Sequence, residues 1–337
     1  MHQPLRLTID RAALQSNWRW LAERAGTAAG AAIKANGYGI GARGALEALA
    51  EAGCRDFLVS TWWEAERLGP IPAGLSLSVL HGPGPNDLLV NARPTLNSVE
   101  QVARWKAIGG GKPCDVMIDT GMNRLGLRPE EAGCLHGLDI ETLLSHLACA
   151  DEDHPLNAQQ LERFRAAVAT IPARRHSLAN SAGICLGAEY SFDLVRPGLA
   201  LYGGVPRVEA KGHIRQVAHL EAQVVQRRRV LAGESVGYGA TFVADADTDA
   251  AIVNIGYADG YFRGFSNRGT AKAAGKTLTL LGRVSMDLLI FDCGDADVGE
   301  GDWVEIDFDL QHAAALCDMS QYELLTGLGA RYERVWK

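Results

Sequence analysis

Residues 31–39 have the sequence Ala31-Ala32-Ile33-Lys34-Ala35-Asn36-Gly37-Tyr38-Gly39, and no other stretch says more about this chain. A short apolar run ends in a single lysine, and the chain then turns at once through Asn and Gly. A strand that ends in this way places the Lys34 amine at the edge of a sheet, partly removed from water. Burial disfavours the charged amine, so Lys34 can serve as a nucleophile or base, as Schiff-base chemistry with an aldehyde cofactor requires. The simpler alternative is a lysine with a buried stem and an amine that reaches water.

The size and composition of the chain are those of an ordinary globular protein. Its 337 residues predict two domains, one of them a large barrel. The 47% hydrophobic and 22% charged content is typical of soluble proteins. A net charge of −7 argues against nucleic acid or an anionic membrane as a partner. No apolar run approaches the ~20 residues of a membrane span.

The cysteines and the first residues indicate a cytoplasmic protein. The seven cysteines are scattered and include no CxxC pair, which is typical of reduced thiols. The first six residues lack the apolar core of a signal peptide.

Strand-like and helix-like stretches alternate over the first two thirds of the chain. Helical patterns cover 10–25, 42–53, 98–108 and 155–171, and Asp10 is a plausible N-cap of the first. The apolar runs between them lie at 29–34, 57–60, 76–80, 94–97, 114–119, 140–145, 175–179 and 193–201. Eight such units predict an α/β fold in which residues 1–214 form an N-terminal (β/α)8 barrel.

The pattern changes at about residue 215. Short β-like runs then follow one another between Gly and Asp residues, and helical patterns are absent until the last stretch. These runs lie at 224–225, 236–238, 251–255, 277–280 and 288–291. We therefore expect a C-terminal, mainly-β domain over residues 215–337.

Unusual polar residues follow the predicted barrel strands repeatedly. Function in such a barrel gathers where strands end and the following loops begin. The polar stretches in this position are Lys34 with Tyr38, Asp119–Gly126, Ser145–His146, His176–Gly183 and Val195–Leu199. Any one of them could be structural, but five in the same topological position predict an active site.

These stretches, in this order, resemble the alanine racemases, which are fold-type III pyridoxal-phosphate enzymes. The resemblance covers nearly the whole chain. It rests on residues 34–41, 119–126, 176–183, 195–203, 237–239, 256–260 and 282–287. Separated motifs in a fixed order are far more specific than a lone lysine and turn.

The resemblance implies that pyridoxal phosphate is held at the carboxyl ends of the barrel strands. Lys34 would bear the cofactor and later act as a base, His146 would pack against the pyridine ring, and Arg196 would face its nitrogen. Gly-rich turns present backbone N–H groups to an anion, which suits the phosphate. The phosphate would be bound by Tyr38, Ser181 and the amides of Gly198 and Leu199. The implied cofactor-binding residues are Lys34, Tyr38, His146, Asn180, Ser181, Arg196, Gly198 and Leu199.

The resemblance also implies the reaction and its second base. Racemisation of an amino acid removes a proton from one face of Cα and returns it to the other, so two bases are required. The base opposite Lys34 would be Tyr238 of a partner subunit, which makes the protein a homodimer with shared active sites. The implied substrate-binding residues are Arg124, Tyr257, Met286 and Asp287.

Two positions depart from the family pattern. Many members carry a modified lysine seven residues before the Arg124 equivalent, and this chain has Met117 there. Some members place a phosphate-binding tyrosine near the C-terminus, and the matching position here is Ala330, with Tyr332 and Trp336 nearby. Both departures leave the breadth of the substrate range open.

Other functions remain to be weighed against alanine racemisation. Serine racemases and broad-range racemases would share these motifs. The motifs also fit both an enzyme that supplies D-alanine for peptidoglycan and one that takes part in alanine breakdown. Fold-type III decarboxylases share the barrel but use a cysteine-centred motif in place of Gly237-Tyr238-Gly239, and non-catalytic cofactor carriers are single barrels.

Two further patterns point to other ligands but are weak. Gly39-Ile40-Gly41-Ala42-Arg43-Gly44 satisfies a dinucleotide-binding pattern, with Glu64 as the acidic partner, yet a Lys34-to-Tyr38 insert separates it from the strand. The aspartates between 287 and 302 lack calcium-loop spacing and are expected to be solvated turns, so we expect no metal site.

Overall fold

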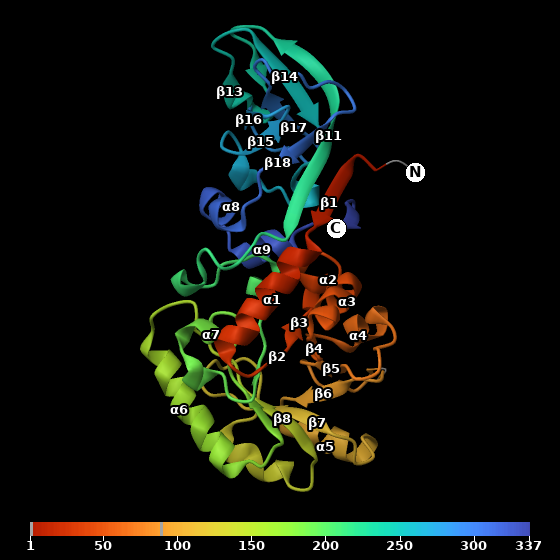
Figure 1. The fold of residues 1–337 in the computed structure, drawn as a ribbon, viewed down its shortest axis with the longest axis vertical. Helices are drawn as coiled ribbons and strands as arrows, with labels where there is room; N and C mark the ends of the chain where they lie inside the picture. The colour runs from red at the N-terminus through yellow and green to blue at the C-terminus, as the bar shows by residue number, and fades with distance from the viewer. Residues whose placement is uncertain (1–2, 88–89) are drawn as a thin grey trace. The chain divides into compact units, whose positions relative to one another are not determined.

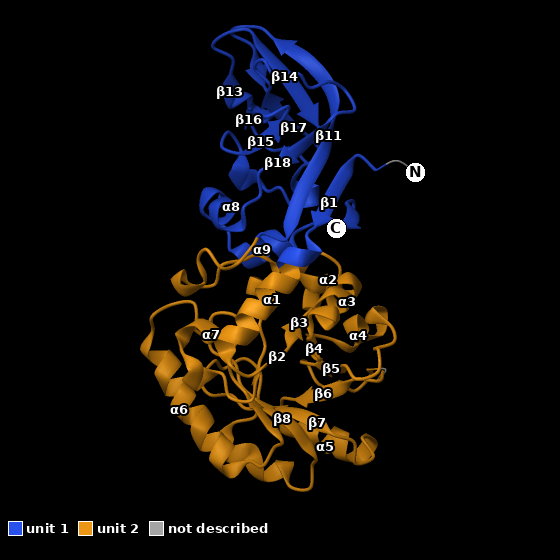
Figure 2. Cartoon of the chain, in the orientation of Figure 1, with its two compact units in different colours: residues 1–13, 216–337 blue, residues 14–215 orange. Residues whose placement is uncertain are grey.

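The computed structural model describes residues 3–87 and 90–337, and the chain divides into two compact units (Figure 2). Leu14–Arg215 forms one unit, which we call the barrel unit. The described residues up to Ala13 join Gln216–Lys337 in the other, which we call the β unit. Within the described residues, no helix is both long and apolar enough to cross a membrane.

The barrel unit is built on parallel strands that curl into a ring (Figure 1). Seven strands of the described chain are hydrogen-bonded in sequence order, from β3 to β9. An eighth, β10 (Leu194–Val195), pairs with β2 (Ala28–Ala29), directly before β3. The others are β3 (Ala31–Ala32), β4 (Asp56–Val59), β5 (Ser76–Val79), β6 (Arg93–Leu96), β7 (Cys114–Met117), β8 (Ile140–Leu144) and β9 (Arg175–Ser177).

Backbone hydrogen bonds on both sides of β10 close this ring. The Gly30 and Ala32 N–H groups donate to Val195 and Pro197 carbonyls, each at 2.9 Å. On the other side, the Arg196 N–H donates to Ala179 O, also at 2.9 Å. The predicted barrel is therefore confirmed, with its eighth strand joined to its first.

The eighth strand is much shorter than predicted. We expected it over 193–201, but the strand ends at Val195 and Leu199–Tyr202 forms a 3₁₀ turn. The Pro197 carbonyl still accepts from Ala32 N, but Pro197 has no N–H group to donate, so regular strand pairing does not continue beyond it.

Helices surround the strands, as Figure 1 shows. The predicted helical stretches are all present within a residue or two, and Asp10 caps the first by accepting from Ala13 N at 2.8 Å. The helices of the barrel unit are α1 (Arg11–Ala25), α2 (Lys34–Tyr38), α3 (Ala42–Ala52), α4 (Trp62–Leu68), α5 (Val99–Ile108), α6 (Pro155–Thr170) and α7 (Gly183–Leu186). The first residues of α1 belong to the β unit.

The β unit contains a mainly antiparallel sheet that closes on itself. Its order is β14-β17-β16-β15-β18-β11-β1-β19, and β14 also pairs with β11. The first part of β11 alternates buried and half-buried residues, as a strand with one face on a core should. The elements are β1 (Leu5–Ile9), β11 (Ala218–Val230), β12 (Ser235–Val236), β13 (Phe242–Val243), β14 (Thr248–Val253), β15 (Thr270–Ala273), β16 (Lys276–Leu280), β17 (Leu289–Asp292), β18 (Trp303–Ile306), α8 (Leu310–Cys317), α9 (Gln321–Thr326) and β19 (Glu333–Trp336).

The N-terminal strand lies in the β unit, whereas the sequence placed residues 1–214 together in the barrel. β1 pairs antiparallel with β11 and parallel with β19. The partners of Leu7 are Leu220 and Arg334, more than 200 residues away. Such pairing leaves no local signal in the sequence. The expected boundary at 214/215 therefore matches the C-terminal end of the barrel unit, but the sequence did not predict that residues up to Ala13 belong to the β unit.

Candidate active site

The polar residues singled out in the barrel all follow the carboxyl ends of parallel strands. Lys34 comes after β3, Asp119 after β7, His146 after β8, Ser181 after β9 and Arg196 after β10. Because parallel strands end at the same edge, this topology gathers the five segments on one face of the barrel. That face is the candidate active site.

Lys34 stands at the start of a left-handed turn. Positive φ angles follow it at Ala35 (51°), Asn36 (55°), Gly37 (62°) and Tyr38 (52°). Backbone hydrogen bonds close the turn, among them those from Gly37 N to Ile33 O at 2.9 Å and from Gly41 N to Asn36 O at 2.8 Å. Left-handed backbone costs roughly 1–2 kcal/mol per non-glycine residue, so surrounding contacts must hold this conformation.

The environment of Lys34 lowers the pKa of its amine. Burial is the largest cause, followed by the positive charge of Arg124, with Arg196 adding a smaller effect. Glu64 opposes this lowering through its negative charge. A larger fraction of Lys34 is therefore neutral, and so nucleophilic, than for a lysine in water.

Arg196 is a buried cation with fixed hydrogen bonds. Its side chain donates from Nη1 to Ser177 Oγ at 2.5 Å and from Nη2 to Ser145 O at 2.6 Å. Burial lowers its pKa to about 10, which still leaves it charged at neutral pH. Arg196 thus holds a permanent positive charge between the ends of β8 and β9.

His146 is held in the same cluster as a neutral imidazole. Burial is the main cause that lowers its pKa to about 3, and the charges of Arg196, Arg124 and Lys34 act in the same direction. The backbone that follows the His146 side chain is fixed by Gln160 of α6, which donates to His146 O at 2.9 Å and accepts from Ala148 N at 2.8 Å.

This pKa has a consequence for stability that a His146→Gln variant exposes. The unfolded chain binds a proton at His146 below pH 6.5, but the folded protein does not until about pH 3, so stability falls as pH falls between these values. Between pH 8 and pH 5 the loss from this group is about 2 kcal/mol. Urea unfolding of the cofactor-free protein at both pH values should show a smaller loss for His146→Gln than for the wild type. Equal losses would contradict a neutral imidazole at this position.

A buried set of backbone N–H groups lies at the end of β10. Gly198 N and Ala200 N both donate to Ser181 Oγ, at 2.9 and 3.2 Å. The Tyr38 ring lies beside them, stacked on Tyr202 with ring centroids 4.7 Å apart. A Cβ at Gly198 would lie 2.2 Å from the Tyr38 hydroxyl, so only glycine fits here. These donors and hydroxyls converge as an anion site requires.

Asn180 stands next to this set but its side chain has a structural partner. Its Oδ1 accepts from the N–H of Gly183, the first residue of α7, at 2.8 Å. Leu199, between Gly198 and Ala200, is buried and begins the 3₁₀ turn.

Arg124 is exposed on the loop after β7. The Asp119 carboxylate fixes the start of this loop by accepting from Gly121, Met122 and Asn123 N–H groups at 2.9 to 3.1 Å. Arg124 is close enough to Lys34 and His146 to lower the pKa of both. Met117, which stands where many relatives carry a modified lysine, is buried in β7.

The remaining candidate residues belong to the β unit. Tyr238 is 68% exposed in the turn between β12 and β13. The segments of Tyr257 and Met286 lie against one another, because Tyr257 N donates to Ser285 O and Ala258 N to Met286 O, at 3.0 and 3.1 Å. Met286 is itself 52% exposed.

Asp287 is tied to the segment of Tyr257 through one arginine. Arg331 donates to Asp287 at 2.7 Å and, from Nε and Nη2, to both oxygens of the buried Asp259 at 2.6 Å. Tyr332, next in the chain, is a core residue of the β unit, and among the described residues its buried hydroxyl has no hydrogen-bond partner. A tyrosine buried in this way does not replace the C-terminal phosphate-binding tyrosine that the resemblance leads one to look for.

Two of the aspartates weighed as a metal site accept hydrogen bonds within turns of the β unit. Asp292 and Asp302 accept from Gly294 N and Gly299 N, at 2.8 and 2.7 Å. This fits the expectation of solvated turns.

Sequence analysis missed three contributors to the site. Ala200 supplies a backbone donor beside Gly198, and Gln160 fixes the His146 segment. Gln160 lies on the apolar stripe of its helix, four residues after Leu156, and a polar residue there is a detectable signal. Glu64, weighed only as part of a dinucleotide pattern, instead accepts a hydrogen bond from Ala35 N at 2.7 Å.

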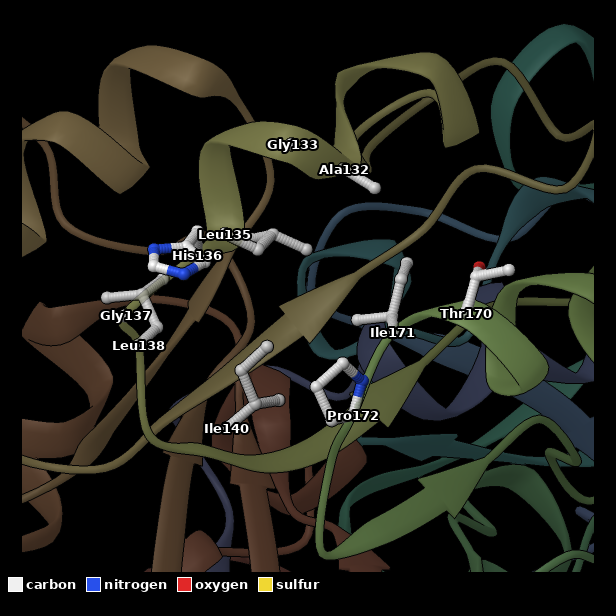
Figure 3. Close-up of a pocket in the computed structure, with 10 residues that line it drawn as sticks. All are labelled: Ala132, Gly133, Leu135, His136, Gly137, Leu138, Ile140, Thr170, Ile171 and Pro172. Atoms are coloured by element: carbon white, nitrogen blue, oxygen red, sulfur yellow. The ribbon is translucent and has the colours of Figure 1, made fainter.

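Figure 3 shows a separate pocket of about 350 Å³. It lies toward the amino end of β8, away from the candidate active site. Its lining includes Ile140, where β8 begins, and the side chains of Leu135 and Ile171. The candidate active site is at the other end of the strands, so this pocket takes no part in it.

Comparison with known proteins gives consistent matches along the chain. A model described as the N-terminal domain of alanine racemase matches residues 9–206, and one described as its C-terminal domain matches residues 217–336. An alanine racemase of Rhodospirillum rubrum is 43% identical over 97% of this chain and 94% of its own. One of Acidiphilium cryptum is 41% identical over 98% of both. Among solved structures, an alanine racemase from Bartonella henselae with covalently bound pyridoxal phosphate has a TM-score of 0.90 and 36% identity, with full coverage of both chains.

Proposed function

This chain belongs to the alanine racemase family of pyridoxal-phosphate-dependent, fold-type III enzymes, and we propose that it interconverts L- and D-alanine with Lys34 and Tyr238 as the two bases. The observation that supports this most directly is the partly buried Lys34 amine, whose pKa is lowered, at the carboxyl end of the barrel strands. Serine and broader-range racemisation are the alternatives of the same class.

The residues of the barrel fit the cofactor. Lys34 supplies the amine that an aldehyde requires, and the donors around Ser181, Gly198, Leu199 and Ala200 suit a phosphate. The Tyr38 hydroxyl would be a further hydrogen-bond donor to the phosphate. When bound, the pyridoxal ring draws electrons from Cα of an attached amino acid and so acidifies its α-proton.

Three barrel residues then orient the ring and the substrate. Arg196, charged and held by Ser177 and Ser145, would donate toward the pyridine nitrogen. His146, kept neutral, would pack against the ring without adding a charge. Arg124 holds the substrate carboxylate, since a guanidinium matches a carboxylate in charge and shape.

The proton is moved by two groups on opposite faces of Cα. The Lys34 amine would take the proton from, or return it to, one face. Tyr238 does the same on the other face, as a residue of the partner subunit in a homodimer. Met286, Asp287 and Tyr257 would line the substrate side of this shared site.

The cytoplasm is the proposed location. All seven cysteines lie within the described residues and are free thiols. Free thiols persist in a reducing compartment, which supports the proposal.

Proton NMR of L-alanine in D₂O with the protein and added pyridoxal phosphate tests the function. Loss of the α-proton signal together with accumulating D-alanine is the expected result. Loss of the signal without D-alanine would mean that Lys34 works and the opposite base does not. An unchanged spectrum with alanine, serine and other amino acids would defeat the proposal.

The phosphate site predicts the effect of Gly198→Ala. The new Cβ would meet the Tyr38 hydroxyl and displace it, so cofactor affinity should fall by roughly tenfold or more, the value of one or two lost hydrogen bonds to a charged group. Equilibrium binding of pyridoxal phosphate measures this. Gly133→Ala is the control, since a Cβ at Gly133 meets nothing within 4 Å. Equal affinities in the two variants would show that Gly198 does not border the phosphate.

A further inference from the structure

Glu64 connects helix α4 to the turn that carries Lys34. One carboxylate oxygen, Oε1, accepts from Ala35 N at 2.7 Å. The other, Oε2, accepts from Ser60 N at 2.7 Å and Thr61 N at 3.0 Å. Thr61 Oγ1 in turn accepts from Glu64 N at 3.1 Å, which completes a capping box at the start of α4. A capping box uses only one side of the carboxylate. The bond to Ala35 is additional.

The bond to Ala35 falls where the backbone is strained. Ala35 is the first residue with positive φ after Lys34, and the next four residues also have positive φ. Alanine gains nothing from this conformation, unlike Asn36 or Gly37. A charge-assisted hydrogen bond to the Ala35 N–H is therefore well placed to keep the turn, and with it the Lys34 backbone, in one conformation.

The charge of Glu64 acts in a site that is otherwise positive. Arg124 and Arg196 both disfavour the ammonium form of Lys34, and burial does so more strongly. Glu64 favours the ammonium form, and so limits how far the pKa of Lys34 is lowered.

We propose that Glu64 is a positioning residue for Lys34, which fixes the left-handed turn through Ala35 N and supplies the negative charge that opposes the site's arginines. This role rests on the proposed function of Lys34 as the cofactor-bearing lysine. It also explains why the residue is an acid. Three N–H groups face the two oxygens, and a glutamine would turn its own NH₂ group toward at least one of them.

Glu64→Gln tests the charge and the contact together. In the full-length protein without cofactor, the rate at which acetic anhydride modifies Lys34 is followed against pH by peptide mass spectrometry. The midpoint of this profile should move to lower pH in Glu64→Gln, because an anion near the amine is lost. The affinity for pyridoxal phosphate should fall about tenfold, since the turn is no longer held.

Two matched variants separate this from a general effect on α4. Glu66→Gln removes the same charge from an exposed position on the same helix. Thr61→Ala breaks the capping box and should lower thermal stability, but it leaves the bond from Ala35 N to Glu64 possible. Both should keep the wild-type midpoint for Lys34. A Glu64→Gln midpoint equal to theirs would overturn the charge effect.

Glu64→Asp separates position from charge, and it serves equally if Glu64→Gln does not fold. It keeps the anion but withdraws the carboxylate by one methylene, so its midpoint should stay nearer the wild type while cofactor affinity still falls. Wild-type affinity in Glu64→Asp would overturn the role in holding the turn. The modification assay contains no substrate or cofactor, so its result does not depend on racemisation. If the protein failed to racemise alanine, the proposed function would be wrong, but a shifted midpoint would still show the effect of Glu64 on Lys34.

Discussion

Replacing Lys34 by alanine is expected to abolish racemisation, with a loss of about 10⁴-fold or more, because in the proposed mechanism this one residue both bears the cofactor and serves as a base. The cofactor should also be lost when the protein is desalted. Both effects follow from the position of Lys34, which is the lysine at the carboxyl end of the first barrel strand. The α-proton exchange of alanine in D₂O and the pyridoxal phosphate content after gel filtration measure them.

Two controls make this result specific. Lys34→Arg keeps a positive charge at the same place, but guanidinium stays protonated and cannot serve as a nucleophile, so it should be as inactive as Lys34→Ala. Lys272→Ala, at an exposed position of β15, should behave as the wild type. Retention of cofactor by Lys34→Ala, with exchange within tenfold of the wild type, would mean that another amine bears the cofactor.

The barrel strands were predictable because of how parallel sheets are buried. β4, β5, β7 and β8 lie within a residue or so of the predicted runs at their starts, and most of their residues are buried. Strands covered on both faces are nearly continuous apolar runs, and short turns separate them from helices. The predicted end of β10 was wrong because apolar residues continue past Pro197, whereas the strand ends at Val195.

The backbone conformation of the segment that follows Lys34 could not be predicted from the sequence. Asn36 and Gly37 predict a turn, and both tolerate positive φ, but nothing in Ala35 or Tyr38 predicts that they share it. That conformation depends on contacts from elsewhere, including the Glu64 carboxylate 29 positions along the chain. The capping-box pattern Thr61-x-x-Glu64 predicts a helix start, whereas the second use of the same carboxylate is visible only in the folded protein.

Replacing Tyr238 by phenylalanine is expected to slow racemisation by roughly 10²–10⁴-fold, the usual contribution of a positioned acid or base. The ring remains and only the hydroxyl is lost, and because the side chain is 68% exposed, thermal unfolding should be unchanged. Lys34 would still exchange the α-proton of one enantiomer with D₂O, without inversion. Tyr322→Phe, at an exposed position of α9, is the control. Racemisation at the wild-type rate in Tyr238→Phe would end the two-base assignment.

Mixing the two inactive variants then tests which chain supplies each base. If Tyr238 acts in the site of its partner, a hybrid dimer of Lys34→Ala and Tyr238→Phe chains contains one site with both bases intact and one with neither. Random exchange of subunits should then restore about a quarter of the wild-type sites, since half the dimers are hybrid and each has one good site. If Tyr238 acts in its own chain, every site lacks one base and no activity returns. Because the variants are the same in both cases, the recovered activity depends only on the arrangement of the chains.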